Sequence, residues 1–243
     1  MANFPFDPTE VDPLTTRDGC MHLKDQALSL SLYAPTMSDE RLCYAQYAKI
    51  NTEKNFKKNG FPERLFKSHF GDFVCRNEQD QKLKDRLMAY CEGINKGYSM
   101  GTPSFAMYGP PGTGKTFAAV CVAKEASWNR FVPAYVTVSS LAREVRSTFR
   151  RGSEESEESI LKKYSEFGLL VVDEIGAGTG SDHERAMFTD VISERYNSKR
   201  PTILISNLDL KDFKESLGER VTDRMSEDGG FILPVLGASR RRE

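Results

Sequence analysis

A glycine-rich stretch between two apolar runs constrains the fold of this chain more than any other feature. It reads GPPGTGKT from Gly109 to Thr116 and fits the pattern G-x-x-x-x-G-K-[ST] of a phosphate-binding loop. The run Ser104 to Tyr108 before it suits a buried strand, and Phe117 to Lys124 after it suits a helix. A strand, a loop and a helix in this order gather backbone N–H groups and a helix N-terminus around a polyphosphate. Chance would give such a match in roughly one chain of this length in a hundred, so we interpret the loop as a nucleotide site rather than a turn.

Two residues at the end of the loop carry specific chemistry. Lys115 would reach the β- and γ-phosphates of a nucleotide, and the Thr116 hydroxyl would bind Mg²⁺. The loop alone does not separate a kinase from a motor or a switch. The residues expected to line the nucleotide are Gly109, Pro110, Pro111, Gly112, Thr113, Gly114, Lys115, Thr116 and Phe117.

Composition narrows the class of protein. The 243 residues suffice for one full domain and a smaller appendage, and the formal net charge is −1, so any DNA contact must come from a local patch. No apolar run approaches the ~18 residues that span a bilayer, and no secretory signal is recognisable. The five cysteines form no C-x-x-C pair, and the spacing of Cys20, His22 and Cys43 matches no zinc motif. We therefore expect a cytoplasmic protein with reduced thiols and no membrane contact.

Strand-like and helix-like stretches alternate along the second half of the chain. Apolar runs predict strands at residues 104–108, 133–138, 169–172, 201–206 and 231–235. Helices are expected between them, including one that is capped by Ser139 or Ser140 and runs through Phe149. Strands separated by helices imply right-handed crossovers, so we expect an α/β fold with a parallel five-stranded sheet sandwiched by helices.

The first 75 residues lack this alternation. Residues 1–36 contain four prolines and could form a flexible arm or a docking element that orders on a partner. A helix from Ser38 should run to about Lys58 and stop at Gly60, and another is expected over residues 77–95. We assign residues 1–75 to an N-terminal arm with a short helical partner-docking region and a linker, and residues 76–243 to the nucleotide-binding domain.

Polar residues at the ends of two later strands are expected to complete a hydrolytic site. The run LLVVDE places Asp173 at the carboxyl end of a strand, where it would bind Mg²⁺. Glu174 would orient and deprotonate the attacking water. Asn207 closes the strand TILIS and could touch the γ-phosphate or position the water, whereas the alternative is an asparagine that only turns the chain.

Arginines follow in two groups. Arg220 and Arg224 lie one helical turn apart and therefore on one face of a helix, and Arg240, Arg241 and Arg242 lie near the end of the sequence. The forked donors of arginine match the oxygens of a phosphoryl group in transfer. The alternative for each is a solvated surface charge.

The motifs GPPGTGKT, LLVVDEIG, SKRPTILISN and LGERVTDRM, followed by a terminal arginine, occur in an order that resembles AAA+ helicase loaders of the DnaC type, in the DnaC/IstB-like ATP-binding family. The resemblance runs from about Asn55 to Arg240. It implies an AAA+ P-loop NTPase core in residues 76–243 and an ATPase activity that uses ATP and Mg²⁺.

The resemblance also implies roles for single residues. Asn207 corresponds to the first sensor, and Arg224, with Arg220 beside it, to the arginine finger that a neighbouring subunit inserts. The second sensor falls on Arg240 or on the adjacent Arg241, because this chain has Ala-Ser-Arg where the family usually has Ser-Tyr-Arg.

A further element of the family, after the second strand, contacts single-stranded DNA. The matching segment here is SSLAREVRSTFRR, in which three arginines at steps of three and four form one basic face beside a phenylalanine. From the residues alone, this segment could equally be an ordinary amphipathic helix. The residues implied to contact DNA are Arg143, Arg146, Phe149, Arg150, Ser181 and His183.

Three functions are compatible with these expectations. The first is an ATP-dependent loader that binds single-stranded DNA, assembles into a ring or spiral, and delivers a ring helicase of the DnaB type in replication initiation. The second is a transposition helper of the IstB type or another DNA-remodelling ATPase. The third is a nucleotide-gated adaptor that barely hydrolyses ATP, against which Glu174 argues. Residues 1–50 do not resemble the family, so the identity of the protein partner stays open.

Overall fold

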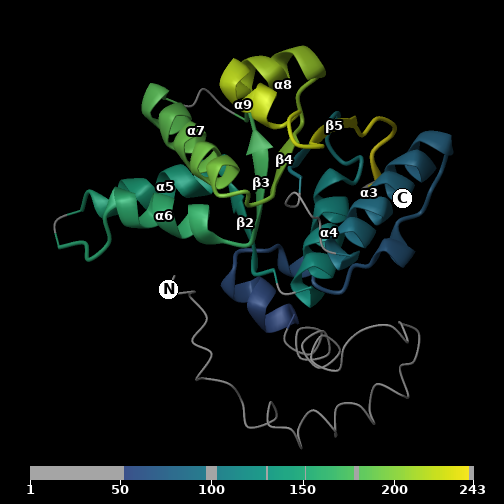
Figure 1. Cartoon of the computed structure of the whole chain (residues 1–243), viewed down its shortest axis with the longest axis horizontal. Coiled ribbons are helices and arrows are strands. Elements are labelled where there is room, and N and C mark those ends of the chain that lie inside the picture. The colour runs from purple at the N-terminus through teal and green to yellow at the C-terminus, as the bar shows by residue number, and fades with distance from the viewer. Residues whose placement is uncertain (1–51, 97–102, 130, 151, 178–180, 241–243) are drawn as a thin grey trace, which may run out of the picture.

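A computed structural model describes residues 52–96, 103–129, 131–150, 152–177 and 181–240 (Figure 1). Within these ranges the strands form one five-stranded sheet in the order β2-β3-β4-β1-β5, and every pair is parallel. The strands are β1 (Phe105–Tyr108), β2 (Pro133–Thr137), β3 (Leu169–Ile175), β4 (Thr202–Ser206) and β5 (Phe231–Pro234). This architecture confirms the predicted fold class.

Helices cover both faces of the sheet. Besides a helical stretch over residues 52–58, the described helices are η2 (Glu63–Leu65), η3 (Phe70–Asp72), α3 (Glu78–Lys96), α4 (Lys115–Trp128), α5 (Val138–Thr148), α6 (Glu157–Glu166), α7 (Asp182–Asn197), α8 (Leu210–Leu217) and α9 (Glu219–Arg224). Helices α3 and α4 pack on one face, and α5 to α9 pack on the other. Figure 1 shows these two groups on opposite sides of the strands.

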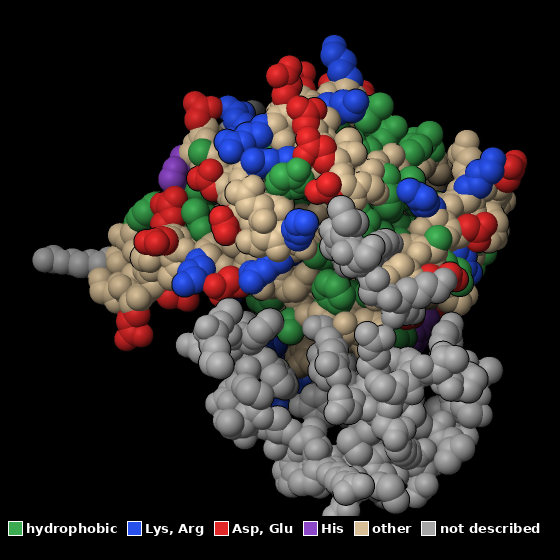
Figure 2. Space-filling model, in the orientation of Figure 1, with side chains coloured by type: hydrophobic (Ala, Val, Ile, Leu, Met, Phe, Trp, Pro, Cys, Tyr) green, Lys and Arg blue, Asp and Glu red, His purple; other side chains and the backbone are tan. Residues whose placement is uncertain are grey.

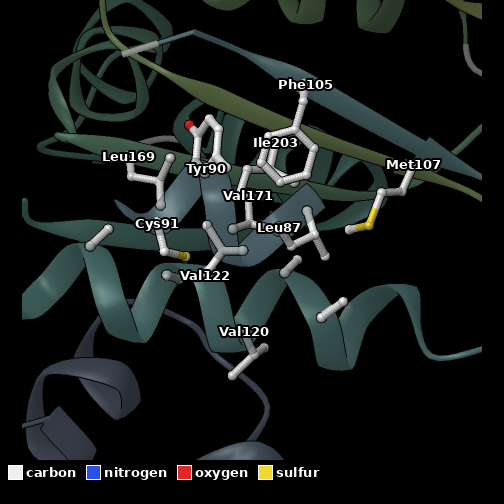
Figure 3. Close-up of a cluster of buried hydrophobic side chains, with 14 of the residues drawn as sticks. Leu87, Tyr90, Cys91, Phe105, Met107, Val120, Val122, Leu169, Val171 and Ile203 are labelled. Atoms are coloured by element: carbon white, nitrogen blue, oxygen red, sulfur yellow. The ribbon is translucent and has the colours of Figure 1, made fainter. Parts of the chain in front are cut away.

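Alternation along the strands builds the two cores. In β3, Leu169 and Val171 join the cluster on the α4 side, whereas Leu170 and Val172 join the cluster on the α7 side. Figure 3 shows Val171 and Ile203 between the sheet and the side chains of α3 and α4. Burying each such side chain contributes about 1.5–3 kcal/mol, so this apolar run forms a strand, between β2 and β4, that is buried on both faces.

Two details differ from the sequence-based expectations. The strand β2 ends at Thr137, whose hydroxyl accepts a hydrogen bond from the Ser140 amide at 3.1 Å, so Thr137 rather than Ser139 or Ser140 caps α5. Helix α8 was not predicted. It begins after Asp209, whose carboxylate caps it, and buries Phe213.

The segment before α3 packs on the nucleotide-binding domain. Residues 52–58 are helical and stop before Gly60 (φ 83°), as predicted. The rings of Phe56, Phe61 and Phe73 are buried in the cluster that α3 and α4 form. The Lys124 amine of α4 donates hydrogen bonds to the carbonyls of Phe66 (2.6 Å) and Ser68 (2.7 Å). Residues 52–75 therefore share the core of the domain that follows, and the boundary at residue 75 stays a prediction.

Other expectations concern residues outside the described ranges. These are the N-terminal arm over residues 1–50, the zinc alternative at Cys20, His22 and Cys43, and the alternative sensor Arg241. Within the described ranges, every helix is too short or too polar to cross a membrane.

Candidate nucleotide-binding site

The glycine-rich loop connects β1 to α4 and depends on glycine at two close contacts. Gly112 and Gly114 have φ angles of 81° and 104°, which residues other than glycine rarely adopt. A Cβ atom on Gly112 would lie 2.9 Å from the Ser239 Cβ, and one on Gly114 would lie 3.2 Å from the Arg240 Cδ. The loop is therefore shaped by its own backbone and closed on one side by residues near the end of the chain.

Lys115 is held inside this loop. It is the first residue of α4 and is only 4% exposed. Its amine donates hydrogen bonds to the carbonyls of Gly109 (2.6 Å) and Pro110 (2.7 Å). The ammonium charge thus lies beside the N-terminus of α4, where backbone N–H groups already favour an anion. This arrangement fits a bound phosphate chain.

Asp173 and Thr116 meet beside the loop. The Thr116 hydroxyl donates a hydrogen bond of 2.7 Å to Asp173 Oδ2, and the same oxygen accepts one from the Tyr135 hydroxyl at 2.9 Å. The Glu174 amide donates to the other carboxylate oxygen at 2.7 Å. Mg²⁺ is usually held by one or two carboxylates together with substrate phosphates. A carboxylate, a hydroxyl and a neighbouring phosphate loop are therefore a suitable donor set.

Glu174 occupies a strained position at the end of β3. Its φ angle is 61°, and the pairing of β3 with β4 shifts register between Val172 and Ile175. A non-glycine residue in this conformation costs on the order of 1–3 kcal/mol and is typical of functional sites. The turn leaves the Glu174 side chain exposed while Asp173 beside it stays buried. The two carboxylates therefore have different environments.

Asn207 lies at the same edge of the sheet. It follows β4 directly and is exposed, and β4 pairs with β3 on one side and β1 on the other. The prediction that its strand neighbours the loop strand is confirmed. The carboxyl ends of three adjacent strands thus bring the loop, Asp173 and Asn207 to one region.

Arg240 contacts the phosphate loop and a buried carboxylate. Its Nε donates a hydrogen bond to the Thr113 carbonyl at 3.0 Å, and its Nη2 lies 2.6 Å from Asp80 Oδ2 on α3. The guanidinium carbon lies 4.3 Å from the centre of the Phe73 ring. Burial alone would raise the pKa of Asp80, but the Arg76 amide and the Arg240 charge outweigh it and hold that pKa below its usual value. Asp80 and Phe73 were not predicted as site residues, because their roles depend on contacts across more than 150 residues of sequence.

The two arginines of α9 lie away from these contacts. Arg224 donates a hydrogen bond to the Ser193 hydroxyl, and its guanidinium carbon lies 5.1 Å from the centre of the Tyr196 ring, both on α7. Arg220, one turn earlier, is exposed. The structure therefore joins Arg240 to the phosphate loop, while it holds Arg224 against α7.

The basic face of α5 lies beside the start of α7. Arg143, Arg146 and Arg150 are exposed, and Phe149 at the end of α5 is 64% exposed. Arg146 pairs with Glu184 at 2.7 Å, and Glu184 also accepts a hydrogen bond from the amide of Ser181 at 3.3 Å.

Ser181 and His183 both have structural contacts at this place. The Ser181 hydroxyl caps α7, and His183 Nε2 lies 3.4 Å from a Glu157 carboxylate oxygen. Arg146 and Glu184 line a hollow of about 260 Å³ that also contains Glu174. Basic and acidic side chains are interspersed over the face shown in Figure 2. Among the expected DNA residues, Arg146 therefore shares this hollow with the strained glutamate.

Comparison with known proteins agrees with this geometry. The family described as IstB-like ATP binding protein matches residues 68–235. The replicative helicase loader DnaC of Escherichia coli (strain K12) is 38% identical over 176 residues, which cover 72% of this chain and 70% of that protein. The replicative helicase loader DnaC of Buchnera aphidicola subsp. Baizongia pistaciae (strain Bp) is 33% identical over 222 residues, which cover 91% and 88%.

Two solved structures show the same fold. The crystal structure of the DnaC helicase loader superposes with a TM-score of 0.62 at 20% identity and covers 72% of this chain and all (100%) of that chain. The crystal structure of DnaI gives a TM-score of 0.58 at 18% identity and covers 75% and 95%. Both confirm the predicted α/β fold, a parallel five-stranded sheet sandwiched by helices.

Proposed function

The chain belongs to the DnaC/IstB-like ATP-binding family, and from this premise we propose that it is an ATP-dependent loader of a replicative ring helicase. The observation that carries the proposal is the contact of Thr116 with Asp173 at 2.7 Å beside the buried Lys115, because these three side chains suit Mg²⁺ and a triphosphate. The names of the two relatives, replicative helicase loader DnaC, supply the biological role.

The residues of the loop would hold ATP. When bound, ATP would supply the γ-phosphoryl group that is transferred to water, and Mg²⁺ would supply positive charge that neutralises the phosphates. Lys115 would contact the phosphates, Thr116 and Asp173 would hold Mg²⁺, and Arg240 would neutralise phosphate charge from the other side of the loop. The remaining contacts would come from the loop residues Gly109, Pro110, Pro111, Gly112, Thr113, Gly114 and Phe117.

Glu174 and Asn207 would support hydrolysis. Glu174 is exposed beside Asp173, so it can accept a proton from a water molecule that attacks the phosphoryl group. Asn207, at the end of the adjacent strand β4, would orient that water. With these two roles, the protein would hydrolyse ATP.

A second copy of the chain would complete the site. Arg224 contacts α7 rather than the phosphate loop of its own chain, which suits a residue that serves a neighbour. Arg220 lies exposed beside it. A head-to-tail contact of this kind generates a ring or a spiral. ATP binding would then favour assembly, and hydrolysis would favour release.

Single-stranded DNA would lie along α5. Arg143, Arg146 and Arg150 offer charges to phosphates, and the exposed Phe149 ring offers a surface on which a base can stack. Ser181 and His183 would contact the strand where α7 begins. The helicase partner, of the DnaB type, would be recruited through the N-terminal region.

A transposition helper is the second candidate, because the matching family is described as IstB-like. It would use the same nucleotide site and the same DNA face, but its protein partner would be a transposase. The identity of the partner therefore separates the two candidates.

A loading assay tests the proposal. The full chain, ATP and the ring helicase of the same genome are mixed with closed circles of single-stranded DNA, and the helicase retained on the circles is measured. We expect retention to require this protein, to fail for Lys115→Ala, and to be normal for the control Lys162→Ala, which alters an exposed side chain on α6. Equal retention without the protein contradicts the loader role, and if ATP hydrolysis is intact, it favours the transposition helper.

A further inference from the structure

Tyr135 contacts the magnesium-binding carboxylate from the edge of the sheet. It lies on β2, and its hydroxyl donates a hydrogen bond of 2.9 Å to Asp173 Oδ2, the oxygen that also accepts the Thr116 hydroxyl. A phenol keeps its proton at neutral pH, so the Tyr135 hydroxyl is the donor and the Asp173 carboxylate is the acceptor in this hydrogen bond.

The same residue is attached to the segment that precedes η2. The Tyr135 amide donates a hydrogen bond of 2.9 Å to the Asn59 carbonyl, and the Asn59 side-chain amide donates one of 2.9 Å to the Pro133 carbonyl. A Cβ atom on Gly60 would lie 2.5 Å from the Tyr135 carbonyl oxygen, so the two backbones are in close contact. Residues 59 and 60 thus cover the outer edge of β2.

Aromatic packing continues this connection. The ring of Tyr135 lies 5.8 Å from the ring of Phe61, centre to centre. Phe61 is 4% exposed and stacks at 4.0 Å on Phe56, which lies in the helical stretch over residues 52–58. Contacts therefore run without a gap from this helix through Tyr135 to Asp173.

We propose that Tyr135 is a positioning residue, whose hydroxyl fixes the Asp173 carboxylate for Mg²⁺ and whose ring and backbone connect that carboxylate to the segment around Phe61. The inference rests on the proposed nucleotide site. Residues that hydrogen-bond a metal ligand orient it, and their loss commonly lowers metal affinity by roughly 10- to 100-fold. The segment around Phe61 follows the N-terminal region directly, so a change in that region can reach the nucleotide site through Tyr135.

The first test removes one oxygen atom. Binding of a fluorescent ATP analogue to the full chain is measured in EDTA and across a Mg²⁺ titration. For Tyr135→Phe, we expect unchanged affinity in EDTA and a Mg²⁺ midpoint that is about tenfold higher than in the wild type. A merely structural role for Tyr135 would weaken binding in both conditions alike.

Tyr164→Phe is the matched control. Its hydroxyl is also part-buried and donates to a carboxylate, Glu144 Oε2 on α5, at 2.6 Å. We expect this variant to lose similar thermal stability while its Mg²⁺ midpoint stays normal. An unchanged Mg²⁺ midpoint in Tyr135→Phe, or an equal shift in Tyr164→Phe, would overturn the role of Tyr135 but would not affect the proposed function. A wild type that binds no nucleotide, with or without Mg²⁺, contradicts the proposed function itself.

The second test addresses the connection to Phe61. Phe61→Leu keeps an apolar side chain but removes the ring that packs on Tyr135, so we expect a smaller rise in the Mg²⁺ midpoint. In the double variant with Tyr135→Phe, the effect of Phe61→Leu should disappear, because it acts through the tyrosine hydroxyl. If the fold-changes in the Mg²⁺ midpoint of the two single variants multiply in the double variant, the two residues act separately, and the proposed connection is overturned.

Discussion

Lys115 and Asp173 are almost fully buried, at 4% and 5% exposure, although an uncompensated charge in a protein interior is strongly unfavourable. Carbonyl dipoles of the loop compensate Lys115, and two hydroxyls and an amide compensate Asp173. Such dipoles offset burial and also fix the position of each charge. The result is one cation and one anion whose positions are fixed in advance, as the proposed contacts with phosphate and Mg²⁺ require.

Replacing Lys115 by alanine tests the first of these charges. A hydrogen bond to a charged group contributes about 1.5–3 kcal/mol, so Lys115→Ala should weaken ATP binding roughly 10- to 100-fold. Equilibrium binding of a fluorescent ATP analogue measures the effect. Lys162→Ala, on the surface of α6, should bind ATP normally, and an unchanged affinity for Lys115→Ala would refute the site.

Glu184 restrains one arginine of the α5 face. Arg146 and Glu184 form an ion pair at 2.7 Å in which Arg146 is 62% exposed, so DNA would compete with the carboxylate for this guanidinium. Partly exposed pairs contribute about 0.2–1 kcal/mol. Glu184→Gln should therefore strengthen binding of single-stranded DNA by up to roughly fivefold.

Glutamine at residue 184 can keep the hydrogen bonds with Ser181 that start α7, because both residue types serve in a capping box. Fluorescence anisotropy with a labelled oligonucleotide measures the change in DNA affinity. The exposed Glu158 provides the control, since Glu158→Gln removes the same charge from another part of the surface. Equal gains in both variants would indicate a general charge effect and would remove Arg146 from the DNA face.

Among the described helices, α7 contacts both the α5 face and Arg224. Its first turn touches the α5 face through Glu184, and its last turns hold Arg224 through Ser193 and Tyr196. Near its end, Arg195 is completely buried (0% exposed) and donates to the carbonyls of Tyr164, Ser165, Phe167 and Pro201 and to the Thr202 hydroxyl. One side chain thus attaches α7 to the starts of β3 and β4.

This attachment predicts a large loss of stability for Arg195→Met. Methionine fills similar volume but cannot donate. The carbonyls of Ser165 and Pro201 keep a second donor, from Arg200 and from the Leu170 amide, whereas those of Tyr164 and Phe167 lose the bond from Arg195. Each unsatisfied buried acceptor costs about 1–3 kcal/mol, so we expect a total of roughly 3–5 kcal/mol. Urea unfolding followed by circular dichroism measures the loss. Arg185→Met, at an exposed site on the same helix, should change the free energy of unfolding by less than about 0.5 kcal/mol. Similar values for both variants would contradict the structural role of Arg195.

Over the described part of the molecule, local patterns in the sequence predicted the sheet, the glycine-rich loop between β1 and α4, and the helices α3, α4 and α7. Each of these has either an uninterrupted apolar run or a periodic face. Helix α8 was missed because its eight residues make little more than two turns, so the spacing of Phe213 and Leu217 on its buried face occurs only once. Tyr135 and Asp80 contact side chains that are distant in sequence, and Arg195 donates mainly to backbone carbonyls. Neither kind of contact produces a local pattern in the sequence. The fold was therefore easier to predict than the residues that support the site.

The proposed assembly predicts rescue between two inactive variants. Glu174→Ala lacks the base of its own site, and Arg224→Ala lacks the arginine for the neighbour's site, so each alone should have little ATPase activity. When they are mixed in equal amounts, an intact Glu174 meets an intact Arg224 at about one interface in four of a randomly assembled ring. The mixture should therefore recover roughly a quarter of the wild-type rate, measured as phosphate release at saturating DNA.

The control for this experiment places both defects on the same side of the interface. Lys115 and Glu174 belong to one subunit's site, so every site in a mixture of Lys115→Ala with Glu174→Ala contains one defect, and no activity should return. Lys115→Ala mixed with Arg224→Ala should again be rescued, because the lysine variant still donates its arginine. Since Arg224 contacts α7 in its own chain, absence of rescue in both arginine mixtures would mean that it acts only there, as a structural residue. Rescue in the arginine mixtures alone would make ATP hydrolysis a property of the assembly rather than of the single chain.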